Sequence, residues 1–347
     1  MNSIEGRTEG SRIQYLDTFR GWLTIFVMTV HTDIQNAPLH TLVQVCMLSG
    51  FFFISGLLTK EEAPIDFFKN RILKLWICQI VLAYVQAFLG VESVVSIVHD
   101  PKSILTIFVE RSIKILQGEA IWFITALLMV SMVSYLLIWL MNKCNISSIW
   151  IIVISACISI LSYFLLVEEG KHMSYYIDVA LVNQFFFILG YLYKKKGFDR
   201  KLEKSLVTKF AFIISSTALV TILVVFSGFT GYDVRNNGYN NIFGFLFIST
   251  LCIFSLLSIC MMVDKVPLIT FMGSHSLLYF AFGSHGYFFA RQIEKLYNPT
   301  LVNPYIRIWM YAIIGSIAMV LPAMFIDRFC PILNGHLKLS SKERASN

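Results

Sequence analysis

Long runs of apolar residues, repeated along most of the chain, constrain this sequence more than any other feature. A helix that crosses a bilayer needs about 20 mostly apolar residues, and ten segments approach that length. Short polar loops separate them, and we find no internal repeat and no long linker. The ten segments are approximately residues 16–34, 41–59, 72–90, 120–141, 149–167, 177–193, 207–227, 241–263, 267–289 and 304–326.

The composition indicates a membrane protein rather than a soluble domain. Of the 347 residues, 56% are apolar and 14% are charged, whereas about a quarter of the residues of a soluble domain are charged. The sequence therefore predicts an all-α fold, a polytopic integral membrane bundle of about ten transmembrane helices. In such a chain the positions of the charged residues in the loops matter more than the net charge of +7. We therefore expect no nucleic-acid partner.

The cysteines and the start of the chain carry no competing signal. The seven cysteines form no CxxC pair and no cluster with histidine, so we interpret them as small core residues and expect no metal site. The polar start of the sequence predicts no cleavable signal peptide there. We divide the chain into an N-terminal tail (1–15), a transmembrane domain (16–327) and a C-terminal tail (328–347).

The distribution of lysine and arginine predicts the orientation. If the ten helices alternate in direction, 20 basic residues fall on the side of the N-terminus and 8 on the other side. Because basic loops are retained in the cytoplasm, we expect both termini there. Segment 103–118 is apolar but carries Glu110, Arg111 and Lys114. We interpret it as an amphipathic helix at the outer interface; if it spans instead, the C-terminus moves outside.

Two ionisable residues lie on the first apolar segment. Arg20 and His31 are eleven residues apart, which is three helical turns plus about 20° and a rise of about 16 Å. They therefore share one helix face, together with Asp17, Thr24 and Met28. With Arg20 at the cytoplasmic surface, His31 would lie past the middle of an apolar layer about 30 Å thick.

This pairing suggests a site for one elongated ligand. Ionisable side chains inside membrane spans usually face a cavity and mark function. Histidine can accept a proton from a hydroxyl near neutral pH, and an arginine at the inner mouth suits a phosphate-bearing ligand. Each residue also has a structural alternative. Arg20 could be an interface anchor, Asp17 a helix cap, and His31 a structural histidine or a residue of the outer headgroup zone.

Six short motifs follow one another along nearly the whole chain. The first is L-D-x-x-R-G-x9-H, with its defined residues at Leu16, Asp17, Arg20, Gly21 and His31. The others are FFFISGLL (51–58), FFKNRILKL (67–75), IWFITALL (121–128), FFFILGYLYKKKG (185–197) and MGSHSLLYFAF (272–282). In this order and spacing they resemble the membrane acyltransferase-3 family, which includes O-acetyltransferases of bacterial surface polysaccharides.

The sequence departs from the family pattern in two motifs. The family often carries a histidine seven residues after the serine of the last motif, where this chain has Gly283 and then His285. We therefore assign no role to His285. The basic motif offers lysines beside Arg71 where paired arginines are usual. We expect no soluble hydrolase-like domain after the last span, so the chain resembles the stand-alone transmembrane members.

The resemblance implies acyl transfer, usually of acetyl, from cytoplasmic acyl-CoA to a hydroxyl of a cell-surface glycan or lipid-linked sugar. It implies acetyl-CoA as donor substrate, no permanently bound cofactor, and a bacterial plasma (inner) membrane location. Arg20, Arg71 and Lys74 would meet the phosphates of the coenzyme. His31 would take the proton of the acceptor hydroxyl as it attacks the thioester, which we favour, or would accept the acyl group itself.

Four further side chains are candidates for substrate contact, each with an alternative in packing. Ser55, beside Gly56, marks close helix packing or a ligand contact. Trp122 lines the substrate path or belongs to an interfacial aromatic belt. Ser276 and Tyr279 share a helix face and could donate to a developing oxyanion, or could bond across helices.

Two other function classes explain less of the sequence. A transporter of a solute or polysaccharide precursor, with an Arg–His proton relay, would be expected to show repeats and acidic groups within spans. A purely structural scaffold function would not explain why His31 and Arg20 lie on the same helix face. Acceptor selectivity is expected in the outer loops, which carry no motif that we can interpret, and no pattern indicates the oligomeric state. These loops are 91–119, 168–176, 228–240 and 290–303.

Overall fold

The structure is a computed structural model and describes residues 14–31, 37–168, 171–198, 206–226, 232–296 and 303–334. Within these ranges the fold is helical, and β structure is confined to one short hairpin and one isolated bridge. The hairpin pairs β1 (Tyr232–Asp233) with β2 (Gly238–Tyr239). Most of the two predicted tails lies outside the described residues.

A helix covers each of the ten apolar segments predicted from the sequence. Six helical stretches in the described ranges are long and apolar enough to cross a membrane. The main helices are α1 (Gln14–Val30), α2 (Ala37–Leu57), α4 (Leu73–Leu89), α7 (Trp122–Lys143), α8 (Ser148–Leu166), α9 (Ile177–Lys195), α11 (Leu206–Phe226), α12 (Ile242–Val263), α13 (Pro267–Ser274), α14 (Ser276–Glu294), α15 (Pro304–Ala318) and α16 (Val320–Phe329).

Three of the predicted spans are not single regular helices. A short helix, α3 (Pro64–Phe67), and a π-helical turn, η2 (Phe68–Ile72), precede α4. The last two spans are divided, one at His275 between α13 and α14 and one at Met319 between α15 and α16. At the first break the Ser274 hydroxyl donates to the carbonyl of Phe271 (2.7 Å). Such a side-chain bond competes with the helical backbone bonds, a local cause that the apolar pattern does not reveal.

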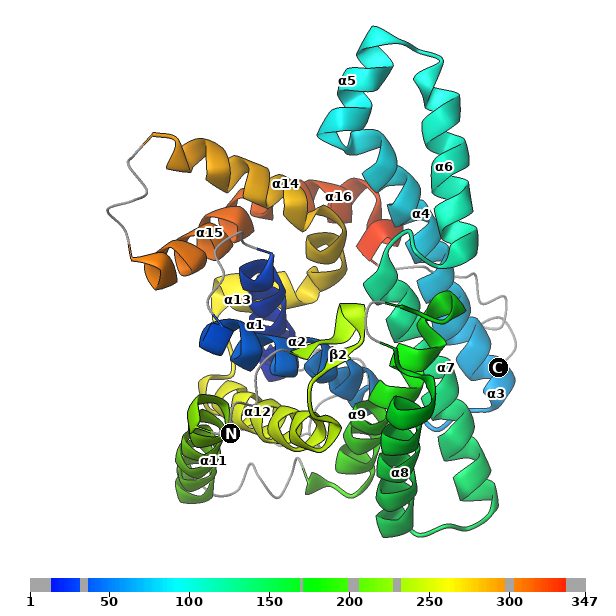
Figure 1. The fold of residues 1–347 in the computed structure, drawn as a ribbon, viewed down its shortest axis with the longest axis vertical. Helices are drawn as coiled ribbons and strands as arrows, with labels where there is room; N and C mark the ends of the chain where they lie inside the picture. The colour runs from blue at the N-terminus through cyan, green and yellow to red at the C-terminus, as the bar shows by residue number, and fades with distance from the viewer. Residues whose placement is uncertain are drawn as a thin grey trace, which may run out of the picture.

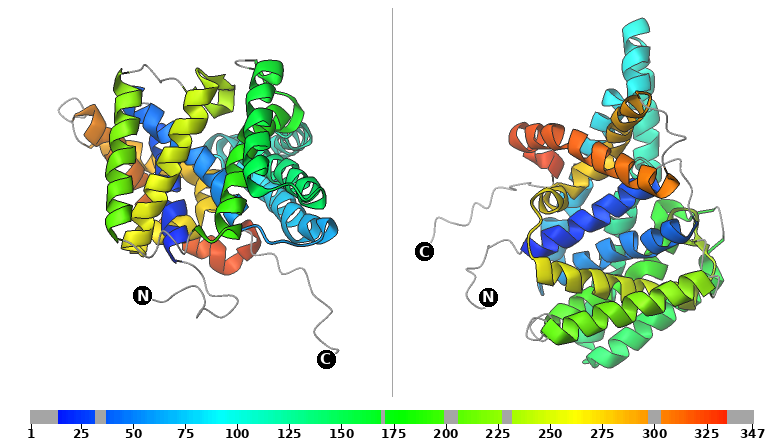
Figure 2. Two further views of the ribbon diagram at one scale, coloured as in Figure 1. Left: turned by 90° about the horizontal axis from the view of Figure 1, so that it is seen from below. Right: turned by 90° about the vertical axis from the view of Figure 1, so that its left-hand side faces the viewer.

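The segment predicted as an amphipathic interfacial helix forms α6 (Ser103–Gln117). With α5 (Val91–His99) and α4 it builds an arm that projects from the bundle (Figure 1). None of the side chains of α6 is buried. The arm lies across the direction of α11 and α12 (Figure 2). The interfacial position of 103–118 stays a prediction.

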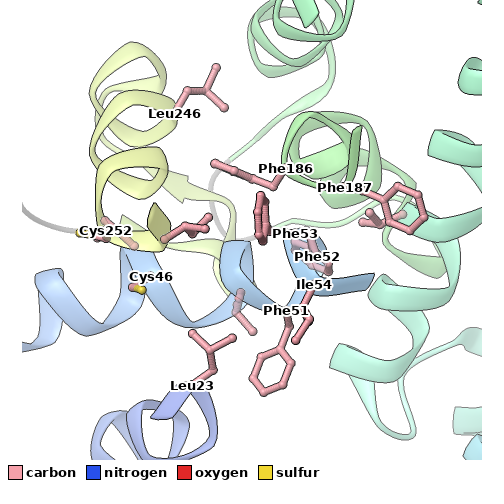
Figure 3. Close-up of a cluster of buried hydrophobic side chains, with 14 of the residues drawn as sticks. Leu23, Cys46, Phe51, Phe52, Phe53, Ile54, Phe186, Phe187, Leu246 and Cys252 are labelled. Atoms are coloured by element: carbon pink, nitrogen blue, oxygen red, sulfur yellow. The ribbon is translucent and has the colours of Figure 1, made fainter. Parts of the chain in front are cut away.

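The core lies where α1, α2, α9 and α12 meet, and it is rich in phenylalanine (Figure 3). Helices α2 and α9 touch backbone to backbone. A Cβ added to Gly56 would lie 1.8 Å from the carbonyl oxygen of Phe187, and one added to Gly190 would lie 2.0 Å from that of Phe53. Gly56 therefore serves close packing, which is the alternative that the sequence offered for the Ser55–Gly56 pair.

The bundle has two ends, which we name by their contents. The hairpin end carries β1–β2, the last turn of α1 and the start of α9. The arginine end carries the start of α1, η2 and the short helix η6 (Pro331–Asn334) (Figure 2). Helix α12 connects the ends, because it starts after β2 and its last turn lies beside Thr18, which donates to the carbonyl of Asp264 (2.7 Å).

Candidate active site

Helix α1 runs through the bundle from the arginine end to the hairpin end, with α2, α12, α13, α14 and α15 packed around it. Arg20 lies in its second turn, and His31 lies in the turn directly after its last residue. The side chain of His31 is exposed. His31 therefore lies at the hairpin end of the bundle, directly after the last residue of α1, and its depth in the apolar layer stays a prediction.

Two arginines meet at the arginine end. The guanidinium of Arg20 lies 3.7 Å from the buried carboxylate of Asp17. Arg71, in η2, donates to the hydroxyl of Thr59 (2.8 Å) and to the carbonyl of Ser55 (2.6 Å). Ser55 thus contributes its backbone oxygen to this cluster. The positive charges of Arg20 and Arg71 are close enough to act on each other.

This arginine pair has the character of an anion site. A phosphate placed between two guanidinium groups would relieve their mutual repulsion and accept hydrogen bonds from both. Two carboxylates balance part of the charge, because Asp17 lies beside Arg20 and Glu62 acts on Arg71. Lys74, three residues after Arg71 and half-buried, adds a third cation from the start of α4.

The junction of α13 and α14 packs directly on the first turns of α1. A Cβ added to Gly273 would lie 1.7 Å from the carbonyl oxygen of Asp17, and one added to Gly21 would lie 1.9 Å from that of Ile269. Only glycine permits such an approach of two backbones. The contact places Ser276, the first residue of α14, at the arginine end.

A loop tie also closes the arginine end. The carboxylate of Glu61 accepts hydrogen bonds from the hydroxyl of Tyr191 (2.6 Å) and the ammonium of Lys195 (2.9 Å). These bonds hold the pKa of the Glu61 carboxyl below its usual value. The tie fixes the loop that follows α2 onto the last turns of α9.

Tyr279, one turn into α14, is buried between the two ends. Its hydroxyl donates to the carbonyl of Ser316 in α15 (3.0 Å). This is the bond across helices that the sequence left open as the alternative to oxyanion binding. Ser276 is half-buried one turn before it.

At the hairpin end, His31 meets residues from two distant parts of the chain. Its ring lies edge to face against that of Tyr287 in α14, with 6.5 Å between the ring centroids. The charges of Arg235 and Asp233, in the hairpin, also act on it. The imidazole therefore has the ring of Tyr287 beside it, and the opposite charges of Arg235 and Asp233 are close enough to act on it.

The hairpin is held in place by Asn237, whose backbone is left-handed (φ 56°). Its side-chain amide donates to the carbonyl of Lys171 (2.7 Å) and to the carboxylate of Asp178, and lies 3.2 Å from Nδ1 of His172. The carboxylate of Asp178 is buried. Burial also raises the pKa of Tyr232, in β1, to about 12. Two of the loops predicted to select the acceptor are thus joined into one unit.

Trp122, the first residue of α7, belongs to the hairpin end. Its ring lies 5.9 Å from that of Tyr176, which in turn lies 4.7 Å from that of His172, measured between centroids. Trp122 therefore continues the surface formed by the joined loops. The structure gathers Asp17, Arg20, Ser55, Arg71, Lys74 and Ser276 at one end, and His31 and Trp122 at the other.

Tyr287 and the hairpin were not among the residues predicted from the sequence, although each leaves a signal there. Asn237–Gly238 is a dipeptide typical of tight turns, in a loop that we read as lacking any motif. Tyr287 lies one helical turn after Gly283, the position where the family pattern often has its histidine. A helical count from that position would have found it.

Comparison with known proteins identifies the chain. A family model described as an acyltransferase domain, from acyltransferase family 3, matches residues 13–328. The match includes both ends of α1 and every candidate site residue. No curated protein and no solved structure matches the chain. The chain therefore belongs to this family of membrane acyltransferases and is an acyltransferase enzyme.

Proposed function

We propose that this enzyme moves an acetyl group from acetyl-CoA to a hydroxyl of a cell-surface glycan or lipid-linked sugar. The observation that carries the proposal is the placement of Arg20 and His31 at the two ends of one helix. A cationic pair for phosphates at one end and an imidazole base at the other suit a long thioester with an anionic head.

The orientation follows from the basic residues. We take the bundle to have about ten transmembrane helices with both termini in the cytoplasm of a bacterial cell, so that the arginine end faces the cytoplasm. The distribution of 20 basic residues on that side against 8 on the other supports this. Acetyl-CoA would then bind from the cytoplasm, and the acceptor would bind at the hairpin end in the plasma membrane.

The donor would be held by its phosphates. Arg20, Arg71 and Lys74 supply the positive charge, with Asp17 orienting Arg20. The pantetheine arm would run along α1 toward the hairpin end.

The acceptor would lie at the joined loops of the hairpin end. The ring of Trp122 offers an apolar surface for a sugar face, and His31 takes the proton of the attacking hydroxyl. The oxygen then bonds to the thioester carbon, and the coenzyme leaves as its thiol. No permanently bound cofactor is required. In the other route the imidazole nitrogen would carry the acetyl group between donor and acceptor.

Complementation in a strain that lacks the gene tests the proposal. Mass spectrometry of its surface glycans should show the loss of one acetyl unit, restored by the wild-type gene and not by the His31→Ala variant. Protein level and membrane insertion of the variant should match the wild type. Full restoration of the acetyl unit by His31→Ala would refute the role of this residue.

The donor site is tested separately. In membrane vesicles, Arg20→Ala should raise the acetyl-CoA concentration needed for half-maximal transfer, while transfer at saturating donor is largely retained. An unchanged dependence on acetyl-CoA would exclude Arg20 from the phosphate site.

A further inference from the structure

Two buried tyrosines of α14 differ in what their hydroxyl groups contact. The hydroxyl of Tyr279 donates to the carbonyl of Ser316. The hydroxyl of Tyr287, two turns closer to the hairpin end, has no hydrogen-bond partner among the described residues, although the side chain is only 8% exposed. Because a buried, unpaired hydroxyl is costly, its presence points to a partner that arrives with a ligand.

Close packing at Gly283 brings the ring of Tyr287 to the proposed base. Gly283, one turn before Tyr287, faces α1, and a Cβ added to it would lie 3.0 Å from the sulfur of Met28. His31 follows Met28 by three residues, so the two helices run in the same direction here. The rings of Tyr287 and His31 are therefore neighbours at the hairpin end.

The nearby histidine of α14 points elsewhere. His285 follows Gly283 by two residues, about 200° around the helix, and its Nε2 lies 3.1 Å from the carbonyl of Leu89 in α4. The face of α14 that meets His31 thus presents a tyrosine.

We propose that the Tyr287 hydroxyl donates a hydrogen bond to the carbonyl oxygen of the acyl group during transfer. The inference rests on the proposed function, because it takes His31 as the base. A buried donor beside the proposed base, with no acceptor of its own among the described residues, is the arrangement that stabilises a developing oxyanion.

In the proposed step, one proton and two electron pairs move between the acceptor, His31 and the thioester. The acceptor hydroxyl gives its proton to a ring nitrogen of His31, and its oxygen bonds to the thioester carbon. The electron pair of the C=O bond moves to the oxygen, which accepts the hydrogen bond from Tyr287. When that pair returns, the C–S bond breaks, and the leaving sulfur takes the proton from His31. Tyr287 keeps its own proton throughout.

Substitution of the hydroxyl alone tests the inference. The assay uses the purified full chain in proteoliposomes, acetyl-CoA as donor and the glycan extract of the gene-deleted strain as acceptor. Tyr287→Phe should lower kcat about 100-fold and leave the KM for acetyl-CoA unchanged. Its melting temperature should equal or exceed that of the wild type, because an unpaired buried hydroxyl has been removed.

Two matched Tyr→Phe variants separate catalysis from structure. Tyr279→Phe should lower the melting temperature, because the carbonyl of Ser316 loses its donor. Tyr84→Phe removes a hydroxyl bonded to Ser112 between α4 and α6, and its rate should match the wild type. A Tyr287→Phe variant with wild-type kcat, or one whose lost activity follows a lost melting temperature, overturns the inference.

The activity of His31→Ala distinguishes failure of the proposed base from failure of the Tyr287 assignment. If His31→Ala is inactive while Tyr287→Phe has the wild-type rate, only the Tyr287 assignment fails. If His31→Ala retains the wild-type rate, the proposed base fails instead. Should Tyr287→Phe not fold, 3-fluorotyrosine at position 287 keeps the ring and changes only the acidity of its hydroxyl. An unchanged kcat would then contradict the proposal.

Discussion

The two ends of α1 differ in how their polar groups are satisfied. At the arginine end, Asp17 is paired with Arg20, and Arg71 donates to the backbone and to a hydroxyl. At the hairpin end, the buried hydroxyl of Tyr287 has no partner among the described residues, and His31 is exposed beside it. Under the proposed function, the arginine end would be a preformed platform for the donor, and the hairpin end would be a site whose polar groups find partners only when a ligand binds.

We expect the largest loss of stability from a substitution that disturbs the packing of the arginine end. Gly273→Val should cost about 3 kcal/mol of stability or more, because its side chain would collide with the backbone of α1. Gly90→Ala is the control, since its new Cβ would meet only ordinary contacts at 3.5 Å and beyond. Melting temperatures of the purified variants measure both. A Gly273→Val variant as stable as the control would show that this end is not rigid.

The platform itself is tested at Arg71. Hydrogen bonds from a charged group contribute about 1.5–3 kcal/mol, so we expect Arg71→Gln to raise the KM for acetyl-CoA by about tenfold or more. Arg71→Lys retains the charge without the two-pronged geometry and should recover part of that loss. Steady-state kinetics at varied donor concentration give the answer. If kcat falls while the KM is unchanged, Arg71 acts in the chemistry and the contrast between the ends is lost.

A smaller effect on stability and acceptor binding is expected at Asn237, which joins the two loops of the hairpin end. Asn237→Gly keeps the left-handed backbone without strain but removes the amide that joins the two outer loops. The substitution should lower the free energy of unfolding by about 1 kcal/mol. It should raise the KM for the acceptor and leave the KM for acetyl-CoA unchanged. Asn236→Ala, at an exposed neighbour, serves as the control. An altered KM for acetyl-CoA would show that the two ends are not independent.

Acid should weaken the loop tie of the arginine end slightly. The pKa of the Glu61 carboxyl is held low in the folded protein, so its contribution is present above the unfolded pKa and is lost as pH falls through the folded one. The pair is exposed, so the contribution should stay below about 1 kcal/mol. Glu61→Gln should therefore flatten the fall in melting temperature on acidification. An identical fall in wild type and variant would remove Glu61 from the tie.

Much of the fold was predictable from local pattern. Each apolar segment became a helix, because in a bilayer the backbone must satisfy its own hydrogen bonds. The breaks at His275 and Met319 were missed, because side-chain bonds and close packing act against an apolar pattern that continues through them. Segment 103–118 forms α6, in which no side chain is buried, and its interfacial position stays a prediction.

The candidate site was predictable only in part. The pairing of Arg20 with His31 follows from helical spacing along one segment, and the pattern of motifs indicated the family that the comparison shows. The depth of His31 in the membrane stays a prediction, and the sequence did not show that α1 ends one residue before it. Tyr279 was a predicted candidate for oxyanion binding because of its spacing from Ser276, but its hydroxyl donates a hydrogen bond to α15.

The sequence by itself determined the solvent of this protein, its helices and the family to which it belongs, because these follow from hydropathy and from residues close together along the chain. Only the tertiary structure decided which distant residues meet. Arg71 lies near enough to Arg20 for their charges to interact, the hairpin lies near His31, and it is Tyr287 whose ring lies beside His31. Glycine contacts fix the spacing of α13 and α14 against α1. Such contacts join positions far apart in sequence, where no local pattern records them.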